Sequence, residues 1–314
     1  MPTLRPLALA AALLMTAAAI AAEPSPPATP PAGKGAAKPQ TMQELLAATK
    51  PDEWRTLDPE HTLYLELTTG RVVIELAPLF APRHVTNIEK LAHAHWYDGL
   101  AITRVQDNFV AQWGDPLSGK PDVGEKKLPA EFTRPAGAPN FVRLKEPDTF
   151  APEVGFSGDF PVARASADGE AWLAHCYAMV GVGRDNDPST AIGTELYAVI
   201  GHAPRQLDRN VALVGRVVFG IELLSSLPRG TAELGFYEQP EQRVPIQTVR
   251  VAADVGSADR SRLEVLKTES PTFQKLIEMR RNRKDPWFKY QAGHIDLCNV
   301  PIPVRERPEP RKKG

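Results

Sequence analysis

Short segments in which apolar and polar residues alternate recur along the chain and predict a mainly β fold. In residues 62–76, leucines alternate with polar residues, Thr69 and Gly70 interrupt the pattern, and the alternation then resumes. A period of two on both sides of a turn predicts a β-hairpin. Further β-rich segments cover residues 100–105, 109–113, 172–183, 195–201, 211–220 and 246–252. Together these segments predict seven or eight antiparallel strands.

Two segments with helical character lie among these strands. Pro82 suits the first turn of a helix, where its missing N–H costs nothing, and the next apolar residues share one helical face: Val85, Ile88, Leu91 and Ala92. Residues 220–227 predict a second, shorter helix. Strands joined by glycine-rich turns can avoid exposed edges by closing on themselves. We therefore expect a closed, antiparallel, eight-stranded barrel with helices covering its ends.

Segments outside this pattern divide the chain further. Residues 23–41 hold six prolines and no large apolar residue, which predicts an extended tether, followed by a short helix over 42–50. The globular domain is expected to span 57–256 and to contain an insertion at 117–170, which is rich in Pro, Gly, Asp and Lys with scattered phenylalanines. Residues 257–314 predict a basic C-terminal extension, helical by composition over 260–290.

The charge balance argues against nucleic acid as a partner. The net charge of the 314 residues is −1, although residues 260–314 hold 14 lysines and arginines against 7 acidic residues. This basic tail could make a peripheral contact with an anionic membrane or a partner. A solvated helix face and a frayed end are the alternative, and the one that we favour.

The first 22 residues predict the compartment. A short positive segment is followed by the apolar run 6–20, and Ala19-Ile20-Ala21 fits the small residues that precede a cleavage site. This pattern is typical of a secretory signal peptide and is short for a membrane-spanning helix. Since no other long apolar run follows, we expect no transmembrane segment. The mature protein is expected in the periplasm, with secretion as the alternative.

The chain has two cysteines, Cys176 and Cys298. In an oxidising compartment an even pair predicts a disulfide bond, and two separate buried thiols are the alternative. The bond would connect the barrel to the C-terminal extension.

The segment AITRVQDNFVAQWGDP, residues 101–116, places one arginine and one glutamine among apolar residues. The segment spans the last two of four motifs, which read LTTGRVVIEL, APRHVTNIEKLA, HWYDGLAITRV and NFVAQWGDP. Their order resembles that of the cyclophilin-type peptidyl-prolyl cis-trans isomerases, and GTELYAVIG and QLDRNVALVGRVVFG extend the resemblance more loosely. The resemblance covers about 57–116 and 172–252. It implies catalysis of cis/trans isomerisation at bonds preceding proline, with no cofactor or metal, and the predicted signal peptide makes exported proteins the expected substrates.

The resemblance also implies the site residues. Arg104 would donate to the prolyl nitrogen, Gln112 would orient Arg104 or bind the substrate carbonyl, and Phe109 would form the wall of the proline pocket. Other pocket positions fall on Val110, Met179, Glu195, Tyr197, Leu207 and Val211. The alternatives are a surface ion pair for Arg104, a backbone-paired amide for Gln112 and ordinary barrel core for the apolar residues.

Several residues depart from the family pattern. Thr103 and Val211 stand where histidine is common, Gln206 replaces a pocket-edge aromatic residue, and Glu195 replaces a glutamine. Glu195 could pair with Arg104 or favour basic substrates, and Gln206 should weaken binding of the cyclic peptide cyclosporin. These changes, together with the insertion and the basic extension, keep a second function open: a catalytically weak or silent binding module or chaperone on the same barrel.

Two short motifs are weak candidates for metal sites. His93 and His95 have no further ligand at a zinc-site spacing, and we interpret them as an exposed helix end. The Asp185-Asn-Asp187 segment lacks the glycine and the glutamate of a calcium loop, and we interpret it as a turn.

Overall fold

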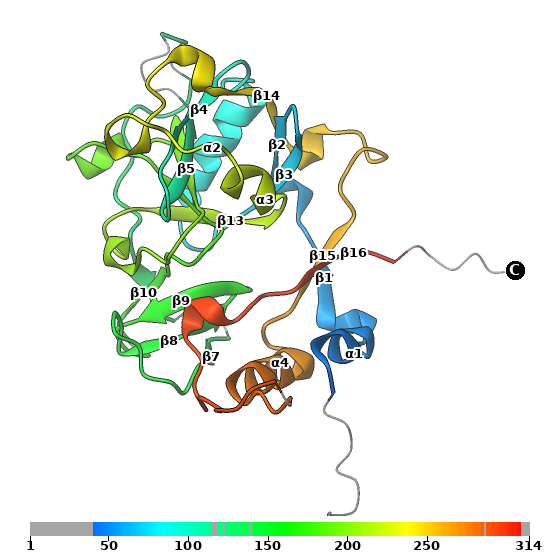
Figure 1. Cartoon of the computed structure of the whole chain (residues 1–314). Coiled ribbons are helices and arrows are strands. Elements are labelled where there is room, and N and C mark those ends of the chain that lie inside the picture. Colours follow the sequence, from blue (N-terminus) through cyan, green and yellow to red (C-terminus); the bar gives the residue numbers. More distant parts are fainter. Residues whose placement is uncertain (1–39, 115–118, 122, 138–139, 286, 309–314) are drawn as a thin grey trace, which may run out of the picture. The chain divides into compact units, whose positions relative to one another are not determined.

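A closed barrel of eight antiparallel strands forms one part of the protein, in the upper half of the view in Figure 1. The computed structural model describes residues 40–114, 119–121, 123–137, 140–285 and 287–308. Around the barrel the strand order is β11-β12-β5-β4-β14-β2-β3-β13. In chain order the strands are β2 (Thr62–Leu67), β3 (Gly70–Leu76), β4 (Ala101–Val105), β5 (Val110–Gly114), β11 (Met179–Val182), β12 (Glu195–Val199), β13 (Leu213–Phe219) and β14 (Val244–Val251). The predicted barrel is thereby confirmed.

Strand alternation fills the barrel interior, and two helices pack against the barrel. Leu63 and Leu65 of β2 pair with Ile74 and Val72 of β3, and all four side chains are buried in one apolar cluster. Helix α2 (Pro82–His93) adds its apolar face to this cluster, and helix α3 (Ile221–Ser225) adds Leu224. The predicted helical faces therefore belong to the barrel core.

The insertion forms a sheet of its own. Five antiparallel strands pair in the order β6-β10-β9-β8-β7: β6 (Arg134–Pro135), β7 (Val142–Arg143), β8 (Glu153–Ser157), β9 (Phe160–Arg164) and β10 (Glu170–Leu173). The β-rich segment expected over 172–183 is divided between two sheets, because β10 ends at Leu173 and β11 of the barrel begins at Met179. The chain turns between them, where Ala178 has a φ of 69°. The continuous apolar run of the sequence gives no sign of this turn.

A third sheet connects the two ends of the described chain. Its strands β1 (Trp54–Thr56), β15 (Leu263–Leu266) and β16 (Val304–Glu306) pair in the order β1-β15-β16. The helix expected over 260–290 is therefore shorter, because Leu263–Leu266 is a strand and helix α4 covers only Pro271–Arg281. Ser270 caps α4 by accepting a hydrogen bond from the Phe273 amide at 3.1 Å. Helix α1 (Met42–Ala47) confirms the short helix predicted after the tether.

A second apolar core packs the insertion sheet against the C-terminal extension. Phe156 of β8 and Phe273 of α4 are fully buried and meet edge to face, with ring centroids 5.0 Å apart. Phe160, Trp172 and Leu276 belong to the same cluster. Short 3-10 turns connect the elements at Pro51–Glu53, Pro59–His61, Pro188–Thr190, Arg205–Leu207, Glu233–Gly235, Pro240–Gln242, Ala252–Asp254 and Leu297–Asn299.

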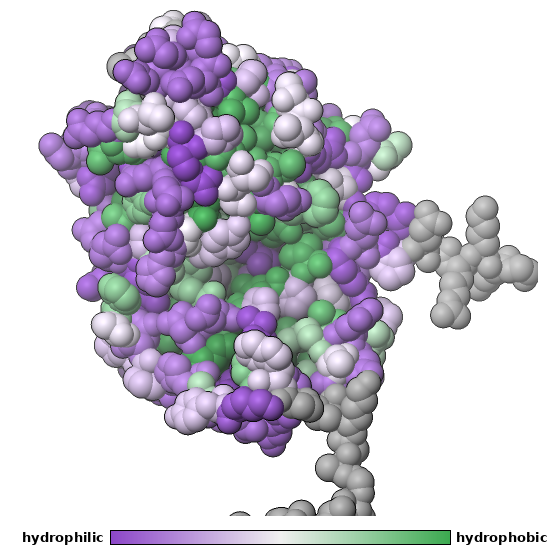
Figure 2. All heavy atoms as spheres, in the orientation of Figure 1, coloured by the Kyte–Doolittle hydropathy of each residue, from purple (hydrophilic) through white to green (hydrophobic). Residues whose placement is uncertain are grey.

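Figure 2 shows mostly hydrophilic residues on one face, with apolar residues visible between them. Within the described residues no helix is long and apolar enough to span a membrane. The predicted signal peptide and nearly all of the predicted tether lie outside those residues.

Cys176 and Cys298 form the predicted disulfide bond, with their Cα atoms 5.0 Å apart. The bond joins the segment between β10 and β11 to the 3-10 turn Leu297–Asn299 across 122 residues of sequence. A loop of this length stabilises the folded state by about 4–5 kcal/mol in the chain-entropy model.

We expect the Cys176→Ser/Cys298→Ser variant to lose about that much free energy of unfolding in denaturant titrations. Reductant should destabilise the wild type and leave the variant unchanged; a variant as stable as the oxidised wild type would contradict the prediction.

Candidate active site

A cavity of about 710 Å³ opens beside β5 and β12 and contains nearly all of the predicted site residues. Its lining consists of Arg104, Phe109, Val110, Gln112, Val182, Gly183, Arg184, Asp185, Asn186, Asp187, Thr190, Glu195, Tyr197, Leu207 and Val211. Charged residues therefore share the cavity with apolar residues contributed by several separate elements.

A bulge in β4 turns Arg104 toward this cavity. Ile102 pairs with Trp113 and Arg104 with Gln112, so that Thr103 is an extra residue against the neighbouring strand. Strict alternation would place Arg104 on the same face as Ile102, which is fully buried in the barrel. The extra residue instead lets Ile102 and Val105 both face the interior while Arg104 reaches the outer surface. A strand can thus carry a cation among core residues without burying it.

Three hydrogen bonds fix the guanidinium of Arg104. Nη1 donates to Oε1 of Gln112 at 3.0 Å, Nε donates to the carbonyl of Leu234 at 2.6 Å, and Nη2 donates to Oε1 of Gln106. The group also lies 5.5 Å from the ring centroid of Phe109 and 5.3 Å from that of Phe236. These bonds use three of the five N–H groups of the guanidinium. Burial lowers the pKa of Arg104 and the carboxylate of Glu195 opposes this, but the group stays charged near neutral pH.

The loop between α3 and β14 supplies contacts that the sequence does not indicate. Leu234 has a φ of 57°, a left-handed conformation that is costly for a bulky residue, and Gly235 follows with a φ of 78°. A Cβ atom at Gly235 would lie 2.6 Å from Cα of Gln106. The tight turn therefore needs glycine, and it brings the Leu234 carbonyl to Arg104.

We expect Gly235→Ala to lower kcat/KM by about tenfold to 100-fold, because a displacement of the turn misplaces Arg104. The peptide isomerisation that the family resemblance implies and the circular dichroism spectrum would be measured together. Gly99→Ala is the matched control, since Gly99 has a φ of 73° and a Cβ there meets no atom within 4 Å. Equal activities in the two variants would show that the turn does not orient the arginine.

The apolar side of the cavity is a cluster on the outer face of the barrel. Val110 and Val199 pair across β5 and β12, Tyr197 pairs with Gln112, and Phe109 and Val211 pack against the group. Leu207 adds the 3-10 turn Arg205–Leu207 to the cavity wall. The cavity therefore presents a compact apolar surface beside the fixed guanidinium of Arg104.

Comparison with known proteins agrees with this geometry. The family model described as cyclophilin type peptidyl-prolyl cis-trans isomerase/CLD matches residues 62–251. The probable peptidyl-prolyl cis-trans isomerase of Brucella suis biovar 1 is 30% identical over 187 residues, which are 59% of this chain and 81% of the relative. The crystal structure of cyclophilin AquaCyp293 from Hirschia baltica superposes with a TM-score of 0.67 at 27% identity, covering 85% of this chain and 98% of that one. The chain belongs to the cyclophilin-type peptidyl-prolyl cis-trans isomerases.

Membership of this family makes the chain an enzyme of peptidyl-prolyl isomerisation, with proline-containing polypeptides as its substrates. The human peptidyl-prolyl cis-trans isomerase-like 1 is 26% identical over 207 residues, 66% of this chain and 96% of the relative. The structural agreement with AquaCyp293 extends over more of the chain than the family model does.

Met179 is one predicted pocket residue of this cyclophilin-type chain that does not line the cavity. It lies at the start of β11 and is buried in the second apolar core, between the barrel and the insertion sheet. The insertion covers this end of β11, and Val182, further along the strand, lines the cavity instead. Gln206, predicted at the pocket edge, is exposed and also absent from the lining.

The rim of the cavity is charged, and part of it was not expected from the sequence. Arg184 donates from Nε to the carbonyl of Asn210 at 2.9 Å, which joins the rim segment to the turn that holds Leu207. Asp187 accepts from the amide of Ser189 at 3.0 Å, which agrees with a turn at Asp185–Asp187. Nothing in the sequence of these polar loops predicts that they lie beside Glu195.

The described residues contain no group of three or more His, Cys, Asp and Glu side chains that could hold a metal ion. His93 contacts Asp254 at 2.6 Å and His95 contacts Asp98 at 3.4 Å, and both imidazoles are exposed near the end of α2. The interpretation of these histidines as an exposed helix end is therefore confirmed.

Proposed function

We propose that this isomerase assists the folding of exported proteins and that Arg104 donates a hydrogen bond to the prolyl nitrogen during rotation. One observation carries the proposal: Arg104 is held by three hydrogen bonds beside the apolar side of the cavity and keeps two N–H groups for a substrate. We call Phe109, Val110, Tyr197, Leu207 and Val211 the proline pocket, because together they offer an apolar surface for a pyrrolidine ring.

The chemistry requires only a directed donor. Amide resonance sets a rotation barrier of about 18–20 kcal/mol. As the bond twists, resonance is lost and the nitrogen becomes pyramidal and able to accept a hydrogen bond. A donor that meets this nitrogen only in the twisted state lowers the barrier without strengthening ground-state binding. The partly buried guanidinium is suited to this role, since its bond is stronger than in water and its direction is already fixed.

Gln112 completes the arrangement. Its Oε1 accepts from Arg104, which leaves the Nε2 amide hydrogens to donate to a carbonyl oxygen of the substrate. The side chain is buried, with 7% exposure, so its orientation is restricted. Gln112 would thereby anchor the peptide on the side of the bond that does not rotate.

Two features support export. The first 22 residues have the composition of a signal peptide, and the protein contains a Cys176–Cys298 disulfide, a bond typical of oxidising compartments. We place the enzyme in the periplasm, with secretion as the alternative. The basic tail could add a peripheral contact with an anionic surface.

The periplasmic location is tested by fractionation of cells that express the full chain or a variant lacking residues 2–22, with alkylation of free thiols. Full-chain protein that stays in the cytoplasm with both thiols reduced would overturn the proposed location.

Activity is tested on two substrates. The purified protein should accelerate isomerisation of a short Xaa-Pro peptide and also the proline-limited refolding phase of an unfolded client, which otherwise takes tens to hundreds of seconds at about 25 °C. Acceleration of the peptide alone would support the isomerase and refute the folding role. Acceleration of neither would refute the proposed function.

A further inference from the structure

A buried polar network lies directly behind the proline pocket and begins at Tyr197. The hydroxyl of Tyr197 lies 3.0 Å from Nε2 of His175, and Nδ1 of His175 lies 2.9 Å from Oδ1 of Asp208. Because a carboxylate only accepts, Nδ1 of His175 donates to Asp208, and in the neutral imidazole Nε2 then accepts from the tyrosine hydroxyl. The two rings are stacked at an angle of 12°.

The Tyr197 ring has little freedom in this position. A Cβ atom at Gly181 would lie 2.3 Å from both Cζ and Oη of Tyr197, so the ring crosses β11 at the place where that strand has no side chain. Tyr197 is 6% exposed and His175 is 0% exposed. The hydrogen bond to His175 therefore holds the far end of a ring whose near surface lines the cavity.

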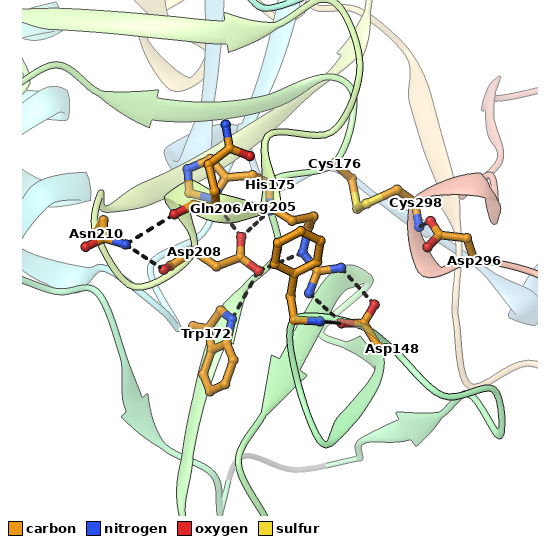
Figure 3. A network of polar contacts seen from close by, with 11 residues as sticks. Asp148, Trp172, His175, Cys176, Arg205, Gln206, Asp208, Asn210, Asp296 and Cys298 are labelled. Atoms are coloured by element: carbon orange, nitrogen blue, oxygen red, sulfur yellow. Dashed lines mark hydrogen bonds and ion pairs between the residues drawn. A yellow bond between two sulfur atoms is a disulfide. The ribbon is translucent and has the colours of Figure 1, made fainter.

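Asp208 connects the same network to the opposite wall of the pocket. It follows Leu207 in the chain, and its carboxylate accepts from the His175 amide at 2.9 Å, from Nε of Arg205 at 2.7 Å and from Nε1 of Trp172 at 3.3 Å (Figure 3). Burial opposes ionisation of Asp208, but the His175 hydrogen bond and the charge of Arg205 outweigh it and lower its pKa. The turn that carries Leu207 is thus fixed relative to Tyr197.

The insertion supplies the outer members of the network. Asp148 accepts from Nη1 and Nη2 of Arg205 at 3.0 and 3.1 Å, and Trp172 belongs to β10 of the insertion sheet (Figure 3). The side chains of the network are at least nine-tenths buried: Asp148, Trp172, His175, Arg205 and Asp208. The disulfide at Cys176 also holds the chain one residue after His175.

We propose that His175 and Asp208 are positioning residues of the isomerase, which fix the Tyr197 floor and the Leu207 wall of the proline pocket relative to each other. Asp148 of the insertion and Trp172 of the insertion sheet support this pair. The inference rests on the proposed function of the cavity as the proline pocket. It assigns the insertion a role in substrate affinity, with no requirement that it touch the substrate.

The test is a double-mutant cycle on the peptide isomerisation assay. His175→Asn keeps an amide near the place of Nδ1 and loses the Tyr197 bond, and Tyr197→Phe removes the same bond from the other side. Each is expected to raise KM about threefold to tenfold, the effect of one net buried hydrogen bond, with kcat within about twofold. The double variant should show no further increase, because the shared bond is already lost. His175→Gln, whose amide reaches the place of Nε2, should restore KM.

His84→Asn is the matched control, because His84 is also fully buried and contacts a carboxylate, Glu131, at 2.6 Å, but lies on α2 outside the cavity lining. This variant should lose stability without a change in KM. Unchanged KM in both Tyr197→Phe and His175→Asn, or additive effects in the double variant, would overturn the inference. Tyr197→Phe keeps the core volume, so the inference stays testable even where His175→Asn folds poorly. A failure of the proposed function is distinct, since Arg104→Ala would then leave the rate unchanged.

Discussion

Replacing Arg104 by alanine is expected to lower kcat/KM for an Xaa-Pro peptide by about 100-fold or more. Loss of one preorganised donor in a partly dehydrated site commonly costs about 10²–10³ in kcat. Here the change removes both N–H groups that remain for the substrate, while the apolar pocket for the ring is retained. We therefore expect the effect mainly in kcat, with KM within a few-fold of the wild type.

Arg104→Lys separates a directed donor from a positive charge. Lysine keeps the charge but has no planar group that could bond Gln112, Gln106 and the Leu234 carbonyl together. We expect this variant to remain close to the alanine variant in kcat. Full activity with lysine would show that charge alone is sufficient and would contradict the proposed hydrogen bond. Denaturant titration of both variants would show whether a reduced rate reflects loss of fold.

The barrel could be predicted from the sequence because its strands are amphipathic or wholly apolar and are separated by clear turns. Leu63, Leu65 and Leu67 give the alternation directly, and the hairpin to β3 follows from Thr69 and Gly70. The position of Arg104 beside Gln112 followed from the family resemblance. Alternation alone would have placed Arg104 in the barrel interior, since a one-residue bulge at Thr103 leaves no mark in the composition.

The insertion and the extension were harder to predict because their strands are short and depend on distant partners. Leu263–Leu266 has a composition that also fits a helix, and it becomes a strand by pairing with β1 on one side and β16 on the other. Phe156 and Phe160 of the insertion are buried in the second core and pack against the rest of the protein, whereas Phe150 of the same insertion is exposed. The contact between the Leu234 carbonyl and Arg104 could not be predicted, because every residue has a main-chain carbonyl and the sequence does not show which one a side chain contacts.

Replacing Arg205 by methionine is expected to lower the free energy of unfolding by about 3–5 kcal/mol at pH 7, the usual cost of removing one partner of a buried ion pair. Arg205 lies between two buried carboxylates, Asp148 at 3.0 Å and Asp208 at 2.7 Å, and the side chains are 4–5% exposed. Without the guanidinium the two acids would lie in a dehydrated site with His175 as the remaining basic side chain of the network. Guanidinium chloride or urea titration would measure the loss.

The pH dependence of this loss identifies its electrostatic origin. In the wild type the pKa of Asp208 is lowered, so its stabilising contribution is present above the unfolded-state value of about 3.9 and is lost as the pH falls through the folded-state value. In Arg205→Met the charge of Arg205 no longer lowers the pKa of Asp208, so the penalty of this dehydrated carboxylate is largest at neutral pH and is relieved by protonation. The difference in stability between wild type and variant should therefore narrow from pH 7 to pH 4.

Two further variants separate lost charge from lost packing. Adding Asp148→Leu to Arg205→Met should return part of the stability, because an apolar replacement of a buried pair is often close to neutral. Arg281→Met, in the extension, removes the partner of Glu146 of the insertion, and both of these side chains are similarly buried, with 5% and 7% exposure. We expect a comparable loss of stability there but an unchanged KM, whereas Arg205→Met should also raise KM, since Arg205 begins the turn that carries Leu207. A loss that is independent of pH would assign the role of Arg205 to packing and would contradict the electrostatic account.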